Sequence, residues 1–337
     1  MANNELMPSP NVSSQTRPAA TRSSLGLIGG FLLRWGLLIF LCALFLIFSI
    51  LEPRFATWTN VQNVIRQAAP LALLACGQSV VLIAGGVDVS VSAIIALSSV
   101  SMVAGVWTVG VIPGIVAAVF VGGLVGAING SIIAFWGVNA FVVTLAMMTI
   151  VRGFSLYITG GIPMYGNIPE SMLFLGNGDI GPFPTAIFVS AIGFAVLYYF
   201  LKLTPAGRQV YAVGGNKEAA RLAGIKVGKI TILAYVISGL FAGAAGAVLT
   251  SRSGIGAPNM GEGRELDAIA AAVIGGVAFG GGVGRVFGII LGVLILSVIK
   301  NGLNLYNVSS FVQLMVIGTI IIAAIVVDRY RQRREVT

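Results

Sequence analysis

The sequence predicts an all-α polytopic membrane protein of about ten transmembrane helices, some of them short or broken by glycine. Three observations support this fold class. Hydrophobic residues make up 57% of the 337 residues and charged residues only 9%, against about a quarter charged in a soluble domain. Uncharged apolar runs of about 20 residues, the length that spans a bilayer, recur along most of the chain. The 45 glycines are typical of membrane helices, which associate through small residues.

The composition also excludes several functional classes. The sequence contains no histidine and two cysteines, so we expect no haem ligation, no metal site and no histidine acid–base catalysis. Cys42 and Cys76 both lie in apolar segments, where a free cysteine usually behaves as a small buried hydrophobic residue. No Walker A pattern G-x-x-x-x-G-K-[ST] occurs. We therefore expect no ATP hydrolysis by this chain and no enzyme activity.

The first apolar segment, 35–51, is longer than the apolar core of a typical signal peptide and has no small-residue cleavage site, so we interpret it as a retained span. Nine further segments follow. The eighth and ninth are short, and whether they form full or half helices stays open. The approximate bounds of the nine are 63–85, 91–110, 112–136, 139–160, 183–203, 230–250, 266–283, 286–304 and 310–327.

The segments that flank the spans are polar. Residues 1–28 are rich in Ser, Asn, Thr and Pro, and we expect a disordered cytoplasmic N-terminal tail. Residues 29–328 should form the membrane domain, with a cytoplasmic coupling loop at 204–229. Residues 329–337 should form a basic cytoplasmic tail.

Basic residues predict the topology, because loops that stay in the cytoplasm retain Lys and Arg. Such residues cluster before the first span, in the loop 204–229 and after the last span, whereas the loop 161–182 contains two acids and no base. All three basic segments lie on one side only if the numbers of spans between them are even, and six followed by four satisfies this condition. We therefore predict that both termini are cytoplasmic, and that the net charge of +9 reflects topology rather than nucleic-acid binding.

One candidate site lies where the second apolar segment meets the third. Gly85 and Gly86 are followed by Asp88, Ser90 and Ser92. Adjacent glycines predict a break between two helices, and Asp88 or Ser90 is suited to cap the second helix. An ionisable residue at membrane depth is also a candidate for a translocation pathway, so both interpretations stay open.

A second candidate is the cytoplasmic loop segment 214–225. Asn216 is suited to cap a short helix, Glu218 favours the positive end of that helix, and Gly224 is suited to end it. A short capped helix in a basic loop is a good docking element for a partner. A plain surface helix between two spans is the alternative.

Glycines spaced by four residues occur in two regions and predict smooth helix faces where two backbones pack closely, with a substrate groove as the alternative. The second region follows Asp267, a further candidate for the pathway. A short, glycine-broken segment thus occurs near Gly85 and again near Gly281, as in the discontinuous helices of transporters. The two glycine sets are Gly122, Gly126 and Gly130, and Gly276, Gly280, Gly284, Gly288 and Gly292.

The fifth apolar segment contains a polar set formed by Asn139, Thr144 and Arg152. Threonine in a membrane helix usually bonds its own backbone or a neighbouring helix, and Arg152 lies near the end of the segment, where it could snorkel. Asn139 and Thr144 are nevertheless candidates for the pathway.

Four motifs together resemble the permease subunit of bacterial ABC monosaccharide importers, most closely the ribose type. Their order and spacing fit that family, and the resemblance covers roughly residues 30–330. The motifs are Gly85-Gly86-Val87-Asp88-Val89-Ser90-Val91; Val213-Gly214-Gly215-Asn216 with Glu218-Ala219-Ala220 and Gly224; Leu266-Asp267-Ala268-Ile269-Ala270 with its Gly-Gly partner; and Asn301-Gly302-Leu303-Asn304.

In that family the permease is a dimer in the bacterial inner membrane, with a cytoplasmic ATPase below it and a periplasmic sugar-binding protein above it. The resemblance implies a homodimer and a monosaccharide substrate, ribose or a similar pentose or polyol. It implies no cofactor in this chain, because ATP and magnesium bind the partner ATPase. Closure of the ATPases would push on the spans joined to the coupling loop. The residues that match the family's coupling loop are Asn216, Glu218, Ala219, Ala220 and Gly224.

The sequence departs from the family pattern at a few positions. Val87 and Val89 stand where relatives often have Ile and Leu, and Ser92-Ala93 where Gly-Ser is common, which weakens the substrate assignment more than the family assignment. Two alternatives stay open. A permease for branched-chain amino acids or amides shares the architecture. An ion-coupled carrier usually needs several charged groups within its spans, and only Asp88 and Asp267 are plausible acids here.

Overall fold

The computed structural model describes residues 24–336 as a series of helices joined by loops. Side chains are described for residues 35–323 and for Val326. The predicted N-terminal tail lies outside the described residues as far as residue 23. From Leu37 onward the chain forms one compact unit, and all the contacts reported below lie within it.

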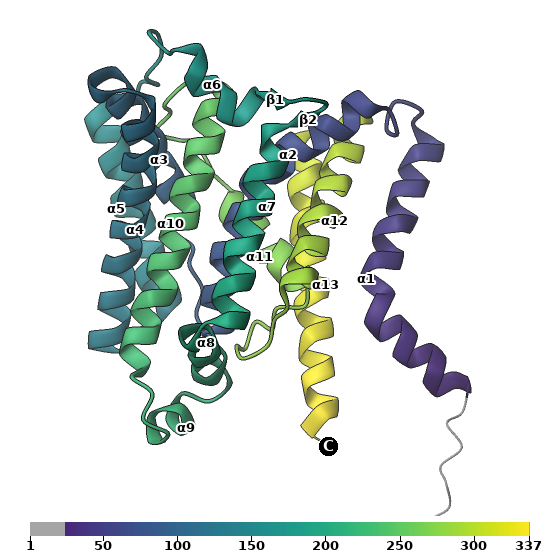
Figure 1. The fold of residues 1–337 in the computed structure, drawn as a ribbon. Coiled ribbons are helices and arrows are strands. Elements are labelled where there is room, and N and C mark those ends of the chain that lie inside the picture. The colour runs from purple at the N-terminus through teal and green to yellow at the C-terminus, as the bar shows by residue number, and fades with distance from the viewer. Residues whose placement is uncertain (1–23, 337) are drawn as a thin grey trace, which may run out of the picture. The chain divides into compact units, whose positions relative to one another are not determined.

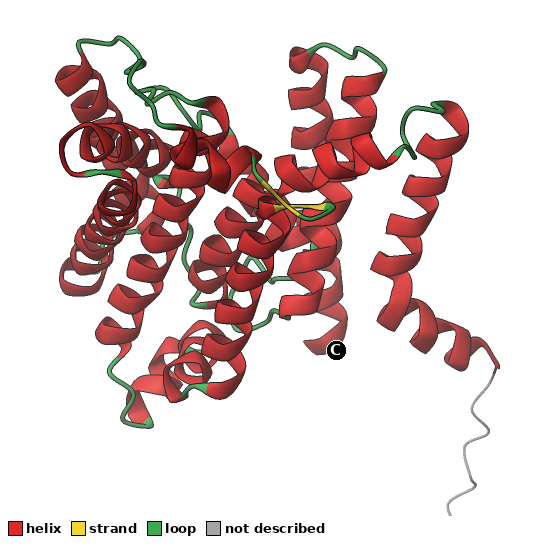
Figure 2. Cartoon of the chain, turned by 45° about the horizontal axis from the view of Figure 1, so that its top comes forward, coloured by secondary structure: helices red, strands yellow, loops and turns green. Residues whose placement is uncertain are grey.

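Helices make up nearly all of the regular structure (Figure 1), and the two strands of the described chain form one short antiparallel hairpin, yellow in Figure 2. The elements in order are α1 (Ser24–Leu51), α2 (Trp58–Ile83), α3 (Val91–Val109), α4 (Val111–Trp136), α5 (Ala140–Thr159), α6 (Glu170–Asn177), β1 (Asp179–Ile180), β2 (Phe183–Pro184), α7 (Thr185–Tyr198), the π-helix η1 (Tyr199–Leu203), α8 (Pro205–Gly215), α9 (Lys217–Leu222), α10 (Val227–Ser253), α11 (Arg264–Ile274), α12 (Val286–Leu305) and α13 (Ser310–Val336).

Seven helices in the described part of the chain are long and apolar enough to cross a bilayer: α2, α3, α4, α5, α7 continued by η1, α10 and α12. The described apolar parts of α1 and α13 are shorter, Trp35–Leu51 and Ser310–Ala323. The prediction of a helical polytopic membrane protein is therefore confirmed at this level. The predicted spans 63–85, 91–110, 112–136 and 139–160 correspond to α2, α3, α4 and α5. The largest difference is at the start of α2, which begins at Trp58.

The predicted eighth span, 266–283, for which a full or a half helix stayed open, is helical only in its first part. Helix α11 ends at Ile274, and at a rise of about 1.5 Å per residue its 11 residues cover roughly half of a bilayer core about 30 Å thick. Gly276 has a φ of +82°, a conformation that ends a helix and favours glycine. Gly276, Gly280 and Gly284 consequently lie in the irregular segment 275–285 and form no helix face.

Both ends of the described chain are helical. Helix α1 begins at Ser24, so residues 24–28 are helical rather than part of a tail, because Leu25, Leu27 and Ile28 extend the apolar segment that follows. Helix α13 continues to Val336, so most of 329–337 prolongs the last helix. That segment contains no glycine or proline, and Arg, Gln and Glu are good helix formers.

The first glycine set packs two helices closely, as predicted. Helix α10 packs against α4, α2 and α3, and α4 meets it through Gly122, Gly126 and Gly130. A Cβ atom on Gly126 would overlap the carbonyl oxygen of Tyr235, and one on Gly130 would lie 2.7 Å from the Cα of Ile232. Only glycine allows the two backbones this approach.

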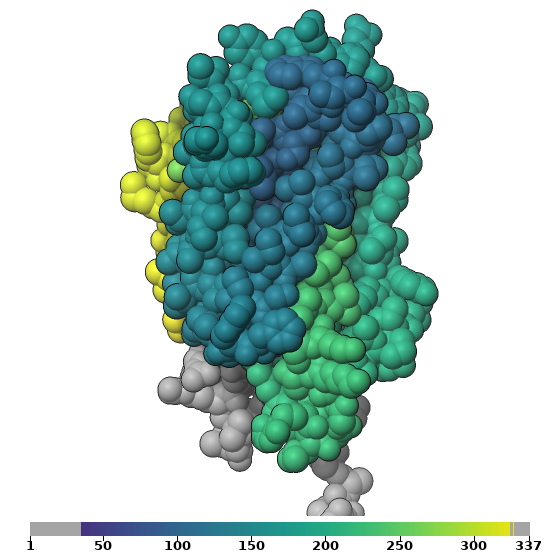
Figure 3. Space-filling model, turned by 90° about the vertical axis from the view of Figure 1, so that its left-hand side faces the viewer, coloured from purple at the N-terminus to yellow at the C-terminus, as the bar shows by residue number. Residues whose placement is uncertain are grey.

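The helices define two ends and a lipid-facing side. The segment from α6 to β2 lies at one end, and α8 and α9 lie at the other (Figure 1); we call them the hairpin end and the α8–α9 end. Figure 3 looks onto the side built by α3, α4 and α5. Phe120, Phe135 and Tyr157 are strongly exposed on these helices. Apolar side chains of this kind are favourable where lipid covers them.

Candidate functional site

The short helix predicted in the loop 214–225 is present as α9. The side chain of Asn216 caps it by accepting a hydrogen bond from the Ala219 N–H at 2.9 Å. Gly224, with φ +81°, follows its end. Glu218 and Arg221 are exposed and form an ion pair along the helix. Of the two predicted alanines, Ala220 is buried against the membrane unit and Ala219 faces outward.

Three segments that are distant in sequence meet beside α9. We call Gly85, Gly214, Gly281 and Gly282 the glycine junction. The Gly282 N–H donates a hydrogen bond to the Ile83 carbonyl oxygen at 2.8 Å. A Cβ on Gly214 would lie 2.6 Å from the Gly282 nitrogen, and a Cβ on Gly281 would lie 2.9 Å from the Gly85 Cα. The end of α2, the end of α8 and the segment 275–285 thus touch backbone to backbone, without side chains between them.

The break after α2 is held by a buried polar network. Asp88 is fully buried, and its carboxylate accepts hydrogen bonds from the Ser90 N–H, the Ser90 hydroxyl and the Ser238 hydroxyl at 3.0, 2.6 and 2.9 Å. Asn129 donates to the Ser90 hydroxyl at 2.8 Å. Thr144 accepts from the Val89 N–H at 3.2 Å. The network therefore fixes the segment 84–90 between α4, α5 and α10.

Helix α3 has Ser90, one of the two predicted caps, at its N-cap position. The Ser90 side chain makes no capping hydrogen bond to the helix and bonds Asp88 instead. Ser92, two residues later, is buried, and its hydroxyl has no partner among the described residues.

A polar cavity of about 580 Å³ lies toward the hairpin end, where α10 ends and α11 begins. Asp267 and Lys300 line it and form an ion pair at 2.5 Å, and their side chains are only 10% and 28% exposed. Arg252 and Arg264 line it as well. Three bases and one acid therefore face the cavity, together with uncharged polar side chains. The latter are Gln67, Ser253, Ser297, Asn304, Ser310 and Gln313.

A second cavity, of about 440 Å³, lies at the α8–α9 end. Asn139, which caps α5 through the Phe141 N–H at 2.9 Å, lines it beside Gly85 and Gly86. Lys217 from α9 and Tyr235 from α10 line it as well. The break after α2 and the start of α9 thus border the same space.

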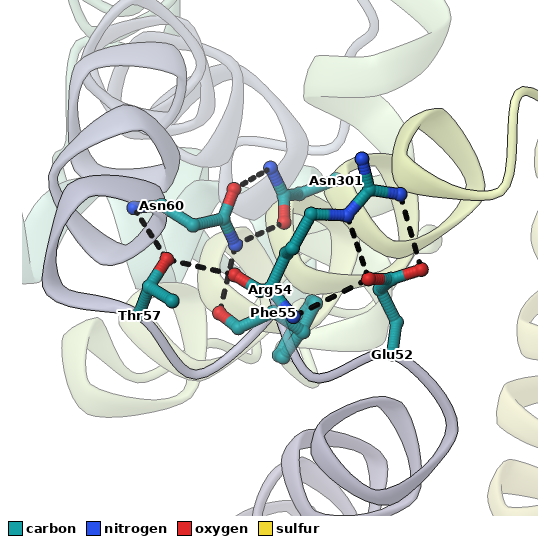
Figure 4. A network of polar contacts seen from close by, with 6 residues as sticks. All are labelled: Glu52, Arg54, Phe55, Thr57, Asn60 and Asn301. Atoms are coloured by element: carbon teal, nitrogen blue, oxygen red, sulfur yellow. Dashed lines mark hydrogen bonds and ion pairs between the residues drawn. The ribbon is translucent and has the colours of Figure 1, made fainter.

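The Asn301-Gly302-Leu303-Asn304 segment lies near the end of α12, and its Asn301 side chain contacts Asn60 near the start of α2 (Figure 4). Asn301 and Asn60 exchange two amide hydrogen bonds, at 2.9 and 3.0 Å, and both side chains are buried. A Cβ on Gly302 would overlap the Phe48 ring. In the adjoining loop, the hydrogen bond from Arg54 holds the pKa of Glu52 below its usual value. This connection anchors the wall of the polar cavity that carries Lys300.

The predicted site residues fall into separate groups. Asp88, Ser90 and Thr144 belong to one buried network, and Asn139 and Asp267 line different cavities. Gly85 belongs to the glycine junction. A Cβ on Gly86 would lie 2.5 Å from the Tyr235 hydroxyl, and one on Gly284 would lie 2.8 Å from the Ile83 side chain. The carbonyl oxygen of Gly280 lies beside Gly85.

Sequence reasoning did not select Arg252, Arg264 or Lys300. Arg252 and Arg264 resembled ordinary charges at the ends of a loop, and only the fold turns both toward one cavity. Lys300 carried a usable signal, because it is an isolated base within an otherwise apolar segment, and such a base is a candidate for function. Its partner Asp267 lies 33 residues away, so no local pattern indicates the pair.

The chain is similar to a known family over most of its length. Residues 60–325 match the model of the branched-chain amino acid transport system / permease component family. The ribose import permease protein RbsC of Bacillus subtilis is 42% identical over 85% of this chain and 89% of that protein. The corresponding protein of Escherichia coli K12 is 38% identical over 88% and 93%.

The L-arabinose transport system permease protein AraH of Escherichia coli K12 is 36% identical over 90% of this chain and 93% of that protein. No solved structure matches the chain. The family assignment therefore rests on the similarity in sequence.

Proposed function

Because the chain belongs to the branched-chain amino acid transport system / permease component family, we propose that it is the membrane-spanning permease subunit of an ATP-binding-cassette importer for a sugar. The observation that carries this function is its similarity, over at least 85% of its length, to permeases named for ribose and L-arabinose import. It is a multi-pass protein of the bacterial inner membrane. A permease for branched-chain amino acids, which the family description also covers, is disfavoured by these relatives.

The proposed substrate is a monosaccharide, ribose or a similar pentose or polyol. The polar cavity supports a passage for such a molecule, because amides, hydroxyls and charged groups can replace the hydrogen bonds that sugar hydroxyls lose on leaving water. Asp267 is then a pathway residue, joined by Lys300 and the two arginines. Asp88, Ser90 and Thr144 would act indirectly, by holding the segment that borders the second cavity, and Ser92 would lie beside them.

The proposed assembly contains two copies of this chain, a cytoplasmic ATPase that binds ATP and magnesium, and a periplasmic sugar-binding protein. The membrane domain corresponds to residues 29–328, with its coupling loop at 204–229. Helix α9 supports the ATPase contact, because it is short, capped and exposed at the end of the helices.

In this proposal the chain crosses the membrane ten times and both termini are cytoplasmic. Helix α11 is too short to cross by itself, but the segment 275–285 continues from it to the α8–α9 end, where Gly282 bonds Ile83. Together they provide one crossing in place of the full helix. The even numbers of crossings that the basic loops require are then retained.

The glycine junction gives the proposed coupling a physical route. A displacement of α9 moves α8, which it follows directly, and Gly214 at the end of α8 touches both Gly281 and the break after α2. Backbone contacts without intervening side chains leave little room for independent adjustment, because packed interiors are nearly incompressible. A push on α9 would therefore reach both discontinuous segments together.

The purified chain alone in liposomes is expected to move no ribose, because it contains no nucleotide site of its own. Adding the ATPase subunit, the binding protein and ATP should start uptake, and replacing ATP by a non-hydrolysable analogue should stop it. Radiolabelled ribose accumulation checks this, with L-arabinose and leucine as competitors. Uptake by the chain alone would instead support an ion-coupled carrier, and competition by leucine alone would support the amino acid alternative.

Breaking the pair of Asp267 and Lys300 is expected to lower transport more than removing both charges. Asp267→Asn leaves Lys300 beside two arginines, and Lys300→Gln leaves a largely buried carboxylate unpaired. Breaking a buried ion pair lowers stability by about 3–5 kcal/mol, whereas replacing both partners is often neutral. Because this pair is partly exposed, we expect a smaller loss of stability from breaking it. Uptake and membrane levels of both single variants and the double variant measure this. A double variant as impaired as the worse single variant would contradict the pairing argument.

A further inference from the structure

An apolar groove with basic residues at one end lies between α7 and α12, outside both cavities described above. It has a volume of about 860 Å³. Phe194 and Tyr198 from α7 line one wall, and Phe287 and Ile290 from α12 line the other. The bases are Lys202 in η1, Arg208 in α8 and Arg285 at the start of α12. We call this feature the basic groove.

The three bases of the basic groove are not neutralised by the protein. All three are exposed, none of the residues that line the groove is acidic, and no carboxylate of the described chain forms an ion pair with any of them. The Tyr211 hydroxyl, from a residue that also lines the groove, donates a hydrogen bond to the Gly284 carbonyl oxygen at 2.9 Å. The groove thus gathers positive charge at one end of an apolar surface.

Two helix ends add to this charge. Arg208 lies in the first turns of α8, and Arg285 is the N-cap residue of α12. The N-terminus of a helix carries a partial positive charge, so a base there is unfavourable and an anion is favourable. Neither helix has an acidic residue in its first turn. A bound anion would relieve the repulsion at both ends.

We propose that the basic groove binds an anionic phospholipid from the membrane leaflet at the α8–α9 end. The phosphate lies among Lys202, Arg208 and Arg285, and the acyl chains follow Phe194, Phe287 and Ile290 between α7 and α12. Basic pockets between membrane helices take anionic headgroups in this way, and an exposed tyrosine such as Tyr198 suits the interface between headgroup and chains. The apolar walls suit acyl chains, and the lining contains no acidic residue that would repel the phosphate.

The bound lipid would connect segments that the proposed coupling must move together. Its phosphate would bridge Arg208 in α8 and Arg285 at the N-cap of α12, close to the Tyr211–Gly284 hydrogen bond. That bond joins α8 to the segment 275–285, and the glycine junction joins the same two segments through Gly214, Gly281 and Gly282. The lipid would therefore act as an external clamp on the junction, independently of which substrate is carried.

Native mass spectrometry of the purified permease, extracted into detergent with equal amounts of phosphatidylglycerol and phosphatidylcholine, tests the proposal. Wild-type protein should retain phosphatidylglycerol preferentially. The double variant Arg208→Gln/Arg285→Gln should lose that preference. The matched control Lys226→Gln/Lys229→Gln removes two exposed bases at the N-terminus of α10, outside the groove, and should retain the lipid as wild type does.

Ala195→Trp provides a second test that leaves every charge in place, because it fills the groove from the exposed side of α7. It should also displace phosphatidylglycerol, and it keeps the proposal testable if the arginine variant does not fold. Equal retention of both lipids by wild-type protein would overturn the proposal. Unchanged retention in folded Ala195→Trp and Arg208→Gln/Arg285→Gln protein would do so as well, and would leave the importer function untouched.

Discussion

Replacing Gly214 by alanine is expected to abolish transport, whereas the same change at Gly215 is expected to leave it close to wild type. A Cβ on Gly214 would overlap the Ile83 carbonyl oxygen and lie 2.6 Å from the Gly282 nitrogen, so it would press between the atoms of an existing hydrogen bond. A Cβ on Gly215 would meet nothing within 4 Å. Overpacking a tight interior typically costs about 1–3 kcal/mol, and here neither neighbour is a side chain that could turn away.

ATP-driven uptake and ATP hydrolysis should be measured for both variants at matched membrane levels. If the junction carries coupling, Gly214→Ala should retain ATP hydrolysis but lose its link to uptake, or lose thermal stability in detergent where the segments are forced apart. The Gly215→Ala variant controls for the helix propensity of alanine, because both positions lie in the last turn of α8. Normal uptake by Gly214→Ala protein would show that the backbone at the junction can move apart without loss of transport, and would contradict the coupling argument.

Local pattern was enough to predict most of the helices, because bilayer length and apolar runs determine where a membrane helix can form. The same reasoning located α9, since Asn216 and Gly224 are local signals that act within one turn. It failed at residues 275–285. A spacing of four predicts a helix face only if the segment is helical, and the glycines that made the face smooth also removed the propensity to form the helix.

The contacts that assemble the site could not be predicted, because they join segments without a shared local pattern. Asp267 was selected as an acid near the end of an apolar segment, but its partner Lys300 and the bases Arg252 and Arg264 are brought to it by the fold. Asp88 was selected for the same reason, and it lies instead in a buried network with Ser238, which is 150 residues away. Acids near the ends of apolar segments thus indicate candidate positions without revealing their roles.

Reversing the charge of Glu218 is expected to abolish substrate-stimulated ATP hydrolysis while leaving the permease in the membrane. Glu218 lies in the first turn of α9, and its exposed ion pair with Arg221 contributes little to folding. Lysine at this position would also oppose the positive end of the helix, but a six-residue surface helix has few contacts to lose. The main effect should therefore fall on the surface offered to the ATPase.

Two controls separate a docking defect from a local structural one. Arg221→Gln breaks the same ion pair without adding a base at the start of α9, and it should retain most of the stimulation. Glu170→Lys makes the same reversal in the first turn of the short helix α6, at the hairpin end, and should leave ATP hydrolysis unchanged. If Glu218→Lys protein hydrolysed ATP at wild-type rates, α9 would be an ordinary surface helix, and the force from the ATPase would have to enter the helices elsewhere.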